Sequence, residues 1–188
     1  MEDLLEFLNG IYPFPLGLKD ELTPMIKSLR LSEKEYLLRA GDVCKNIYFI
    51  RKGLLRCYYL KETKEVSAWF LKEVDTIVSV ESFYDQLPSY EFIQALEDCE
   101  LFYISFDELE EIYGKYLEFN VIGRKLTTHY LKMWTRQLRY LRSMSALERY
   151  QELLAKEPEL LLRVPLKLLA SYLDMEPETL SRMRGLGN

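Results

Sequence analysis

The stretch from Leu117 to about Met144 constrains the fold most, because it contains no proline and a single glycine. At about 100° per residue, its apolar side chains collect in two stripes on one continuous helix. The first stripe comprises Phe119, Ile122, Leu126, Tyr130, Met133, Tyr140 and Met144. The second stripe comprises Leu131, Trp134, Leu138 and Leu141. The remaining arc is basic and comprises Arg124, Lys125, Lys132, Arg136, Arg139 and Arg142.

A helix with two apolar stripes has to bury two sides. One side can cover the rest of the chain, and the other needs a second surface, which the same helix of a two-fold related copy would supply. The alternative is one wide core stripe inside a single large domain. We favour the homodimer.

Two short helices are expected over 2–10 and 18–29. From about Glu35 to Ile104 the residue pattern changes from helical to strand-like. Runs of four to seven residues rich in Tyr, Phe, Ile, Leu, Val and Trp alternate with turn signals. This pattern predicts short antiparallel strands in a small sandwich or barrel. Gly41 and Gly53 fall in the turns, where a positive φ is expected.

The histidine count excludes several classes of enzyme. His129 is the only histidine, so the chain cannot build a multi-histidine metal site. We expect neither a catalytic site nor a metal site, and we expect His129 to be a polar residue on a helix surface rather than a haem ligand. A cupin-like metal oxygenase is a rival reading of the small barrel, and the single histidine argues against it.

Targeting signals are also missing from the sequence. The acidic start differs from a secretory signal, and no apolar run approaches the roughly 20 residues that span a bilayer. The three cysteines, Cys44, Cys57 and Cys99, have no CxxC spacing and are interpreted as reduced core thiols, with a redox or metal role as the alternative. These features predict a cytoplasmic protein without membrane contact.

Charge is distributed unevenly along the chain. The net charge is −5, yet residues 132–188 contain ten Lys and Arg against seven Asp and Glu. The end of the chain therefore carries +3 and residues 1–131 carry −8. A basic end on an acidic body suggests a polyanionic partner there, although an uneven surface would look the same.

A helix can start at Ser145, with Glu148 three residues later completing a capping box. The segment "LLLRVP", which ends just before Leu166, is expected to be short and extended.

The last segment predicts two short helices joined by a tight turn. Pro165 and Pro177 are placed to open the helices, and Asp174 lies in the turn. The residues that should face inward are Leu169, Ala170, Leu173, Leu180 and Met183. The residues left for the outer face are Glu178, Thr179, Ser181, Arg182 and Arg184. Side chains of these types reach base edges and phosphates when their helix lies in a major groove.

At these residues the sequence resembles the cyclic-AMP receptor protein (Crp/Fnr-like) family of bacterial transcription regulators. "LLASYLDMEPETLSRMR" looks like its helix-turn-helix, and "AGDVCKNIYFIRKGLLRCYYL" is similar to the start of its β-roll. The resemblance implies an α+β chain. Its parts would be an antiparallel cyclic-nucleotide-binding-like β-roll over 1–115, a dimerisation helix over 116–144, and a helix-turn-helix domain over 145–188 with a short or absent wing.

The resemblance also implies roles for single residues and for partners. Glu178 and Arg182 match family positions that touch bases, and Thr179 and Ser181 match neighbours near the DNA backbone. Pro177 replaces a further base-reading arginine of some relatives. Double-stranded DNA and a second copy of the chain are the implied partners, and RNA polymerase is a candidate third partner.

The effector pocket departs from the family pattern. That pattern uses a Gly-Glu pair and, later, an Arg followed by Ser or Thr. Here Val80 precedes Glu81, and Ser89 and Tyr90 stand where the Arg and Ser/Thr belong. Glu81, Ser89 and Tyr90 are therefore the candidate pocket residues, and without a cation we expect cyclic AMP not to bind. The pocket either takes another small molecule or is closed by side chains.

Two functions follow from these observations. We favour a homodimeric, sequence-specific DNA-binding regulator that needs no cofactor and is not controlled by cyclic AMP. The alternative is a ligand-sensing module that has lost DNA recognition and acts through protein partners.

Overall fold

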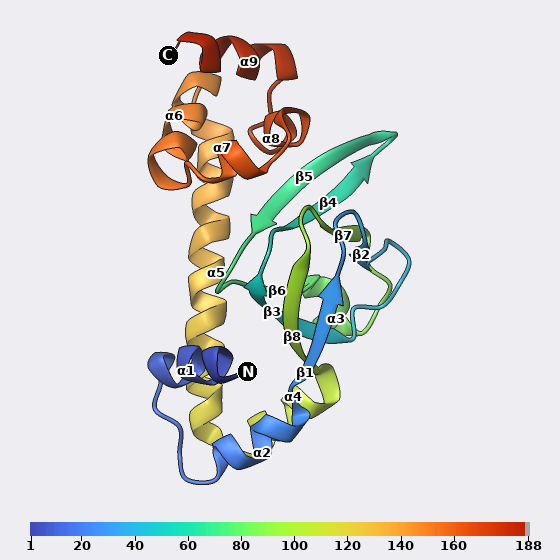
Figure 1. The fold of residues 1–188 in the computed structure, drawn as a ribbon, viewed down its shortest axis with the longest axis vertical. Coiled ribbons are helices and arrows are strands. Elements are labelled where there is room, and N and C mark those ends of the chain that lie inside the picture. Colours follow the sequence, from blue (N-terminus) through green and yellow to red (C-terminus); the bar gives the residue numbers. More distant parts are fainter. Residues whose placement is uncertain (187–188) are drawn as a thin grey trace.

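The computed structural model describes residues 1–186, which form a β-roll, a long helix and a group of C-terminal helices (Figure 1). Two helices, α1 (Glu2–Ile11) and α2 (Leu18–Met25), come first. The strands are β1 (Lys27–Leu31), β2 (Tyr36–Leu38), β3 (Asn46–Lys52), β4 (Leu55–Lys61), β5 (Lys64–Leu71), β6 (Thr76–Ile77), β7 (Glu91–Ala95) and β8 (Cys99–Ser105). The helix α3 (Val80–Asp85) lies between β6 and β7, and the helix α4 (Phe106–Lys115) follows β8.

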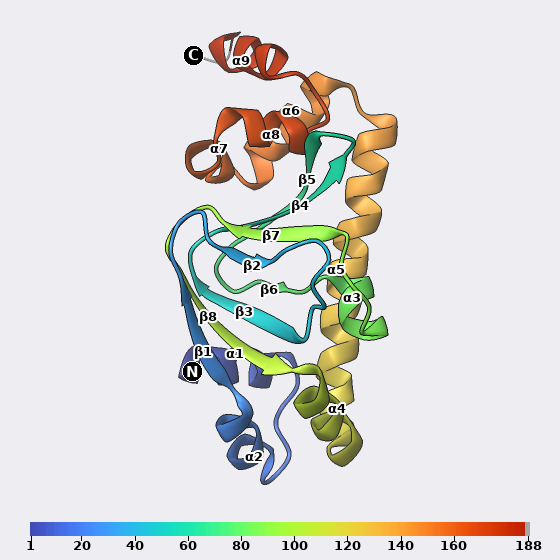
Figure 2. The same cartoon turned by 90° about the vertical axis from the view of Figure 1, so that its right-hand side faces the viewer.

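The strands pair into two four-stranded sheets, with the orders β1-β8-β3-β6 and β2-β7-β4-β5. Every pairing within them is antiparallel. Side chains that alternate along the strands meet between the sheets, where Ile50, Leu55, Ile93 and Leu101 are fully buried. Figure 2 shows the sheets curling around this core. The predicted antiparallel roll is confirmed.

Two glycines in turns adopt the positive φ that the sequence predicted, 96° at Gly41 and 104° at Gly53. They differ in their surroundings. A Cβ on Gly53 would lie 2.6 Å from the Cys99 Sγ and 2.8 Å from the Asp98 carbonyl oxygen, whereas a Cβ on Gly41 would meet open space. The Gly53 turn is therefore held both by its backbone conformation and by a close approach to the start of β8.

Gly53→Ala should consequently lower the free energy of unfolding by about 2–4 kcal/mol, since a strained φ is combined with a clash against backbone. Gly41→Ala is the matched control and should cost about 1 kcal/mol, because only its φ is unfavourable. Urea unfolding followed by circular dichroism measures both values. Equal losses for the two variants would contradict the role assigned to the close approach.

The long helix α5 (Leu117–Ser143) runs along the whole molecule (Figure 1). Its first apolar stripe faces the roll, where Phe119 and Ile122 are buried and Tyr130 accepts a 2.6 Å hydrogen bond from the Thr76 amide. Its second stripe is exposed, and the exposed fractions are Leu131 62%, Trp134 50%, Leu138 51% and Leu141 37%. The helix thus buries one stripe within this chain and leaves the other uncovered.

The C-terminal helices are α6 (Ala146–Lys156), α7 (Leu160–Arg163), α8 (Leu166–Tyr172) and α9 (Pro177–Leu186). Ser145 and Glu148 form the capping box that starts α6. The helices surround a second core, which Leu54 and Phe70 of the roll also enter. Among the helices of residues 1–186, none is long and apolar enough to cross a bilayer.

Two secondary-structure expectations are wrong. The helix expected over 18–29 ends at Met25, and Lys27–Leu31 is instead the strand β1, paired with β8. The segment expected to be extended before Pro165 forms the short helix α7, because Leu160 and Leu161 bury their side chains in the second core. In both places a tertiary contact decides the structure.

Candidate nucleic-acid interface and sensor pocket

The α8–α9 hairpin has the internal packing that the sequence predicts. Leu169, Ala170 and Leu180 are completely buried, and Leu173 is nearly so. The turn between the helices carries Asp174 at a φ of 51°, a left-handed conformation that Asp tolerates better than most residues. The Met175 amide then donates to the Ala170 carbonyl at 3.0 Å. The hairpin is thus a rigid unit that fixes the direction of α9.

The outer face of α9 carries four of the predicted contact residues. Glu178, Ser181 and Arg182 are exposed, and Thr179 is half-buried. The Arg182 guanidinium has one weak contact, at 3.5 Å, with the Thr179 hydroxyl. In Figure 1 this helix forms the end of the molecule opposite α2. These side chains are free to approach a large partner.

Arg184 does not belong to that face, which corrects the prediction. Its side chain is half-buried, and its guanidinium donates a hydrogen bond to the Leu161 carbonyl. The last carbonyls of a short helix such as α7 lack partners within the helix, and an arginine satisfies one of them well. Arg184 therefore fixes α9 to α7.

Three charged side chains join the C-terminal helices to the roll, and we name them the Arg163 cluster: Arg163, Glu73 and Glu97. Arg163 donates to both Glu73 oxygens at 2.9 and 3.0 Å and to both Glu97 oxygens at 2.8 and 2.7 Å. Glu73 also accepts from the Gly53 amide at 2.9 Å. Bidentate pairs of this kind fix geometry as well as adding energy.

The Arg163 guanidinium lowers the pKa of Glu73 from 4.5 to about 2. A carboxyl whose pKa is depressed in the folded state stabilises that state above pH 4.5 and loses the contribution as the pH falls towards 2. Because the Glu73 side chain is 38% exposed, we expect a contribution on the order of 1–2 kcal/mol.

Glu73→Gln should therefore lower the free energy of unfolding at pH 6, and its difference from the unmodified chain should shrink between pH 4.5 and pH 3. Urea unfolding at the three pH values measures this difference. Glu176→Gln, at an exposed position in the α8–α9 turn, is the control and should show no such trend. A Glu73→Gln difference that stays constant with pH would contradict the assigned pKa.

Ser171 provides a second, uncharged joint between α8 and the roll. Its hydroxyl donates to the Glu65 carbonyl at 3.1 Å and accepts from the Ser67 amide at 3.0 Å. The next residue, Tyr172, packs edge-on against Phe70. The first helix of the hairpin is thus attached directly to β5.

The candidate effector pocket differs from its prediction. Of the three predicted residues, only Ser89 is inside, buried beside Ser79 with 2.9 Å between their hydroxyl oxygens. Glu81 is exposed on α3, and Tyr90 is 54% exposed, edge-on to Tyr59. The structure therefore does not gather these three side chains around one ligand position.

Glu91 and Ser79 take the inner positions instead. The Ser79 hydroxyl donates to a Glu91 carboxylate oxygen at 2.7 Å, and the Glu91 amide donates to the Ser89 hydroxyl at 2.9 Å. Burial first, and then the Glu91 charge, raise the pKa of the Cys57 thiol. The nearest preceding arginine, Arg56, is buried and donates to Glu65 and Ser67 at 2.6 and 2.9 Å, while its Nη2 atom has no partner among the described residues. The Glu91 carboxylate is unfavourable for a phosphate beside it.

The three cysteines and the single histidine have the burial and exposure that the sequence predicts. Cys44, Cys57 and Cys99 are buried and free, and His129 is exposed on α5. Within residues 1–186, no group of three His, Cys, Asp or Glu side chains is arranged to hold a metal ion.

Comparison with known proteins identifies the class of this roll. Residues 28–116 match the family model of the cyclic nucleotide-binding domain. The FixK2 structure from Bradyrhizobium japonicum superposes with a TM-score of 0.72 at 19% identity, covering 86% of this chain and 83% of that one. The catabolite activator protein of Thermus thermophilus gives 0.59 at 16% identity, covering 96% and 85%. The fold is therefore that of a cyclic nucleotide-binding roll with a long helix and C-terminal helices.

A sequence relative extends the match beyond the roll. The anaerobic regulatory protein of Pasteurella multocida (strain Pm70) is 27% identical over 188 aligned residues, which cover 92% of this chain and 68% of that protein. The chain is thus similar to this regulatory protein over most of its length, in agreement with the resemblance to the Crp/Fnr family that the sequence indicates.

Proposed function

We propose that this chain is a homodimeric, sequence-specific DNA-binding transcription regulator. The observation that carries the proposal is the exposed outer face of α9, with Glu178, Ser181 and Arg182, on a hairpin whose turn and core fix the direction of that helix. Arginine pairs with guanine and glutamate with cytosine in the major groove. Relatives named as regulatory proteins support the same reading.

The exposed stripe of α5 supports the two-fold partner. Leu131, Trp134, Leu138 and Leu141 are spaced by three and four residues, the repeat by which two helices pack along a shared apolar line. A second copy of the same helix is the partner that matches this surface in length and chemistry. Two recognition helices would then read half-sites about one helical turn of DNA apart.

The sensor pocket supports regulation without cyclic AMP. A cyclic phosphate inside the roll would lie near Glu91, and the charge of Arg56 is already paired with Glu65. Desolvating an anion beside a carboxylate is unfavourable unless a cation compensates. Isothermal titration with cyclic AMP should accordingly give no heat of specific binding.

A salt titration tests the DNA-binding proposal. Sites selected from a random duplex pool are bound to the protein, and fluorescence anisotropy is recorded from about 50 to 200 mM salt. A DNA reader should show a steep fall of log affinity with log salt, and selected sites should bind at least ~10³-fold more tightly than random duplex at one salt concentration. Equal binding of selected and random duplexes would favour the alternative, a module that acts through protein partners.

A further inference from the structure

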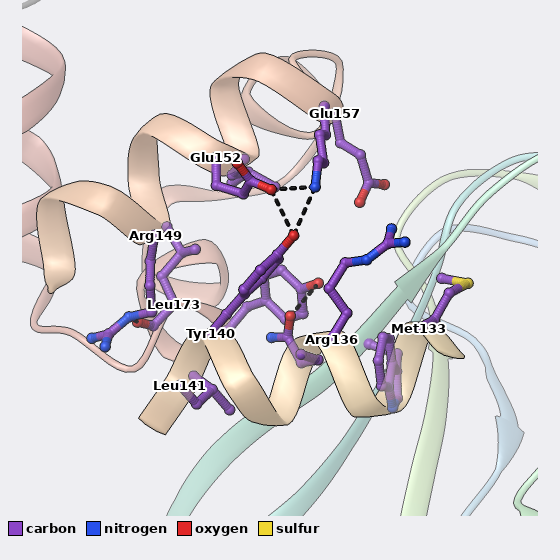
Figure 3. Close-up of a pocket in the computed structure, with 13 residues that line it drawn as sticks. Met133, Arg136, Tyr140, Leu141, Arg149, Glu152, Glu157 and Leu173 are labelled. Atoms are coloured by element: carbon purple, nitrogen blue, oxygen red, sulfur yellow. Dashed lines mark hydrogen bonds and ion pairs between the residues drawn. The ribbon is translucent and has the colours of Figure 1, made fainter. Parts of the chain in front are cut away.

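A cavity of about 90 Å³ lies where the three parts of the molecule meet (Figure 3). Trp69 lines it from β5 of the roll, Tyr140 from α5, and Tyr172 from α8. Glu152 and Leu153 close it from α6. Leu141 of the exposed α5 stripe lies at its edge, and no ligand has been assigned to this cavity above.

The walls of the cavity are flat and apolar. Trp69 is held by stacking on Trp134, with ring centroids 6.2 Å apart and an interplanar angle of 5°. Tyr172 is half-buried, and the burial of its hydroxyl raises the pKa of that group. Met133, Leu153 and Leu173 complete the apolar lining. Rigid aromatic walls of this kind suit the faces of a planar ring.

The carboxylates at the cavity are already compensated by their neighbours. Glu152 accepts from the Tyr140 hydroxyl at 2.6 Å and pairs with Lys156, which also donates to the Tyr140 oxygen at 2.7 Å. Figure 3 shows this triangle of contacts at the centre of the site. Glu157 pairs with Lys72 at 3.5 Å. The lining therefore presents no uncompensated negative charge.

The cationic side chains that line the cavity differ in whether they already have partners. The Arg149 guanidinium is fully used by three backbone carbonyls, those of Leu173 at 2.7 Å, Met144 at 2.8 Å and Asp174 at 2.9 Å. Arg136 is different, because its exposed guanidinium has no hydrogen bond or ion pair with any residue that the structure describes. The lining holds three cations, Arg136, Arg149 and Lys156, and two carboxylates, Glu152 and Glu157, so one positive charge remains.

We propose that this cavity binds a small planar aromatic carboxylate, with the ring against Trp69 and Tyr172 and the carboxylate on Arg136. A space of about 90 Å³ is comparable to one aromatic ring alone, so the acidic substituent would extend out of it towards the exposed Arg136, and a nucleotide is too large. An arginine fork matches a carboxylate in geometry and charge. Because the ligand would touch the roll, α5 and the C-terminal helices together, it would stabilise their present arrangement; its effect on DNA rests on the function proposed above.

Intrinsic fluorescence tests the site directly. The chain has two tryptophans, of which Trp69 lines the cavity and Trp134 stacks on it. The whole chain is titrated with benzoate and phenylacetate, and with the neutral isosteres benzamide and phenylacetamide. We expect a saturable change with at least one acid, and binding of its amide at least about tenfold weaker, because the neutral amide cannot form an ion pair with Arg136.

Three variants at two exposed positions of α5 distinguish a specific role of Arg136 from a general effect of positive charge. Arg136→Gln should weaken binding of the acid about tenfold or more, and Arg136→Lys, which keeps the charge, should restore part of it. Arg142→Gln, six residues further along the same helix, is the matched control and should bind as the unmodified chain does.

Absence of a saturable response to both acids would overturn the proposal, and so would equal binding of acid and amide or an unchanged affinity in Arg136→Gln. None of these measurements involves DNA. A titration in which neither acid binds therefore leaves the DNA-binding proposal intact. Conversely, a protein that does not bind DNA can still bind the aromatic acid.

Discussion

Leu138→Asp should convert the protein from a dimer to a monomer and lower its affinity for a selected DNA site by about 10²–10⁴-fold. Leu138 lies in the middle of the exposed α5 stripe, with Leu131 and Leu141 on either side. The substitution would place two carboxylates at the centre of an apolar contact, and desolvating charge there is unfavourable. A monomer also loses the gain in effective concentration that joins the two half-site contacts.

Light scattering during gel filtration measures the mass, and fluorescence anisotropy measures the DNA affinity. Thr128→Asp is the matched control, since it introduces the same charge on the same helix at an exposed position outside the stripe. It should remain dimeric and should bind DNA normally. A Leu138→Asp protein that stays dimeric, or an unmodified chain that is monomeric at micromolar concentration, would contradict the proposed α5 interface.

Arg182→Ala should weaken binding to a selected DNA site by about ten- to a hundredfold, equivalent to about 1–3 kcal/mol for a bidentate contact with guanine. The side chain is exposed on α9, and within residues 1–186 its one polar contact is the weak hydrogen bond with Thr179, so its removal should leave the fold unchanged. Affinity for random duplex should fall much less, because base contacts discriminate sequence whereas phosphate contacts do not.

Arg30→Ala removes the same charge from the β-roll, away from α9, and serves as the control. Arg30 lies on β1, is 86% exposed, and has a single long ion pair, at 3.5 Å, with Glu100. Its loss should change DNA affinity only slightly. A second selection experiment with Arg182→Ala should show relaxed preference at one base pair of each half-site. Equal losses on selected and random DNA would assign Arg182 to the phosphates instead.

Local patterns predicted the elements whose structure is set by nearby residues. The two stripes of α5 follow from helical periodicity, and the Ser145 capping box follows from a serine and a glutamate three residues apart. The left-handed Asp174 and the positive φ of Gly53 follow from the conformations that these residue types tolerate. In each case the determining interaction lies within a few residues of the chain.

Features set by distant contacts were not predictable. Arg184 was predicted to contact DNA from its residue type and its position on the helix. The Leu161 carbonyl, which it binds instead, comes within its reach only after α7 and α9 pack together. Ser79 gave no signal of its own, because its role depends on Glu91 from a different strand. The ion pairs of Arg163 with Glu73 and Glu97 likewise join segments far apart in the sequence.

In the part of the chain that the structure describes, the second core contains side chains from both sides of the predicted domain boundary near residue 145. Leu54 of the roll is completely buried and Phe70 is 6% exposed, both among side chains of the C-terminal helices. Separating the roll from the C-terminal helices by proteolysis or by recombinant truncation would therefore expose a hydrophobic surface on each fragment. The two parts are not interchangeable modules, and a chimaera that borrows a foreign recognition hairpin would need matching residues at these two positions to remain soluble.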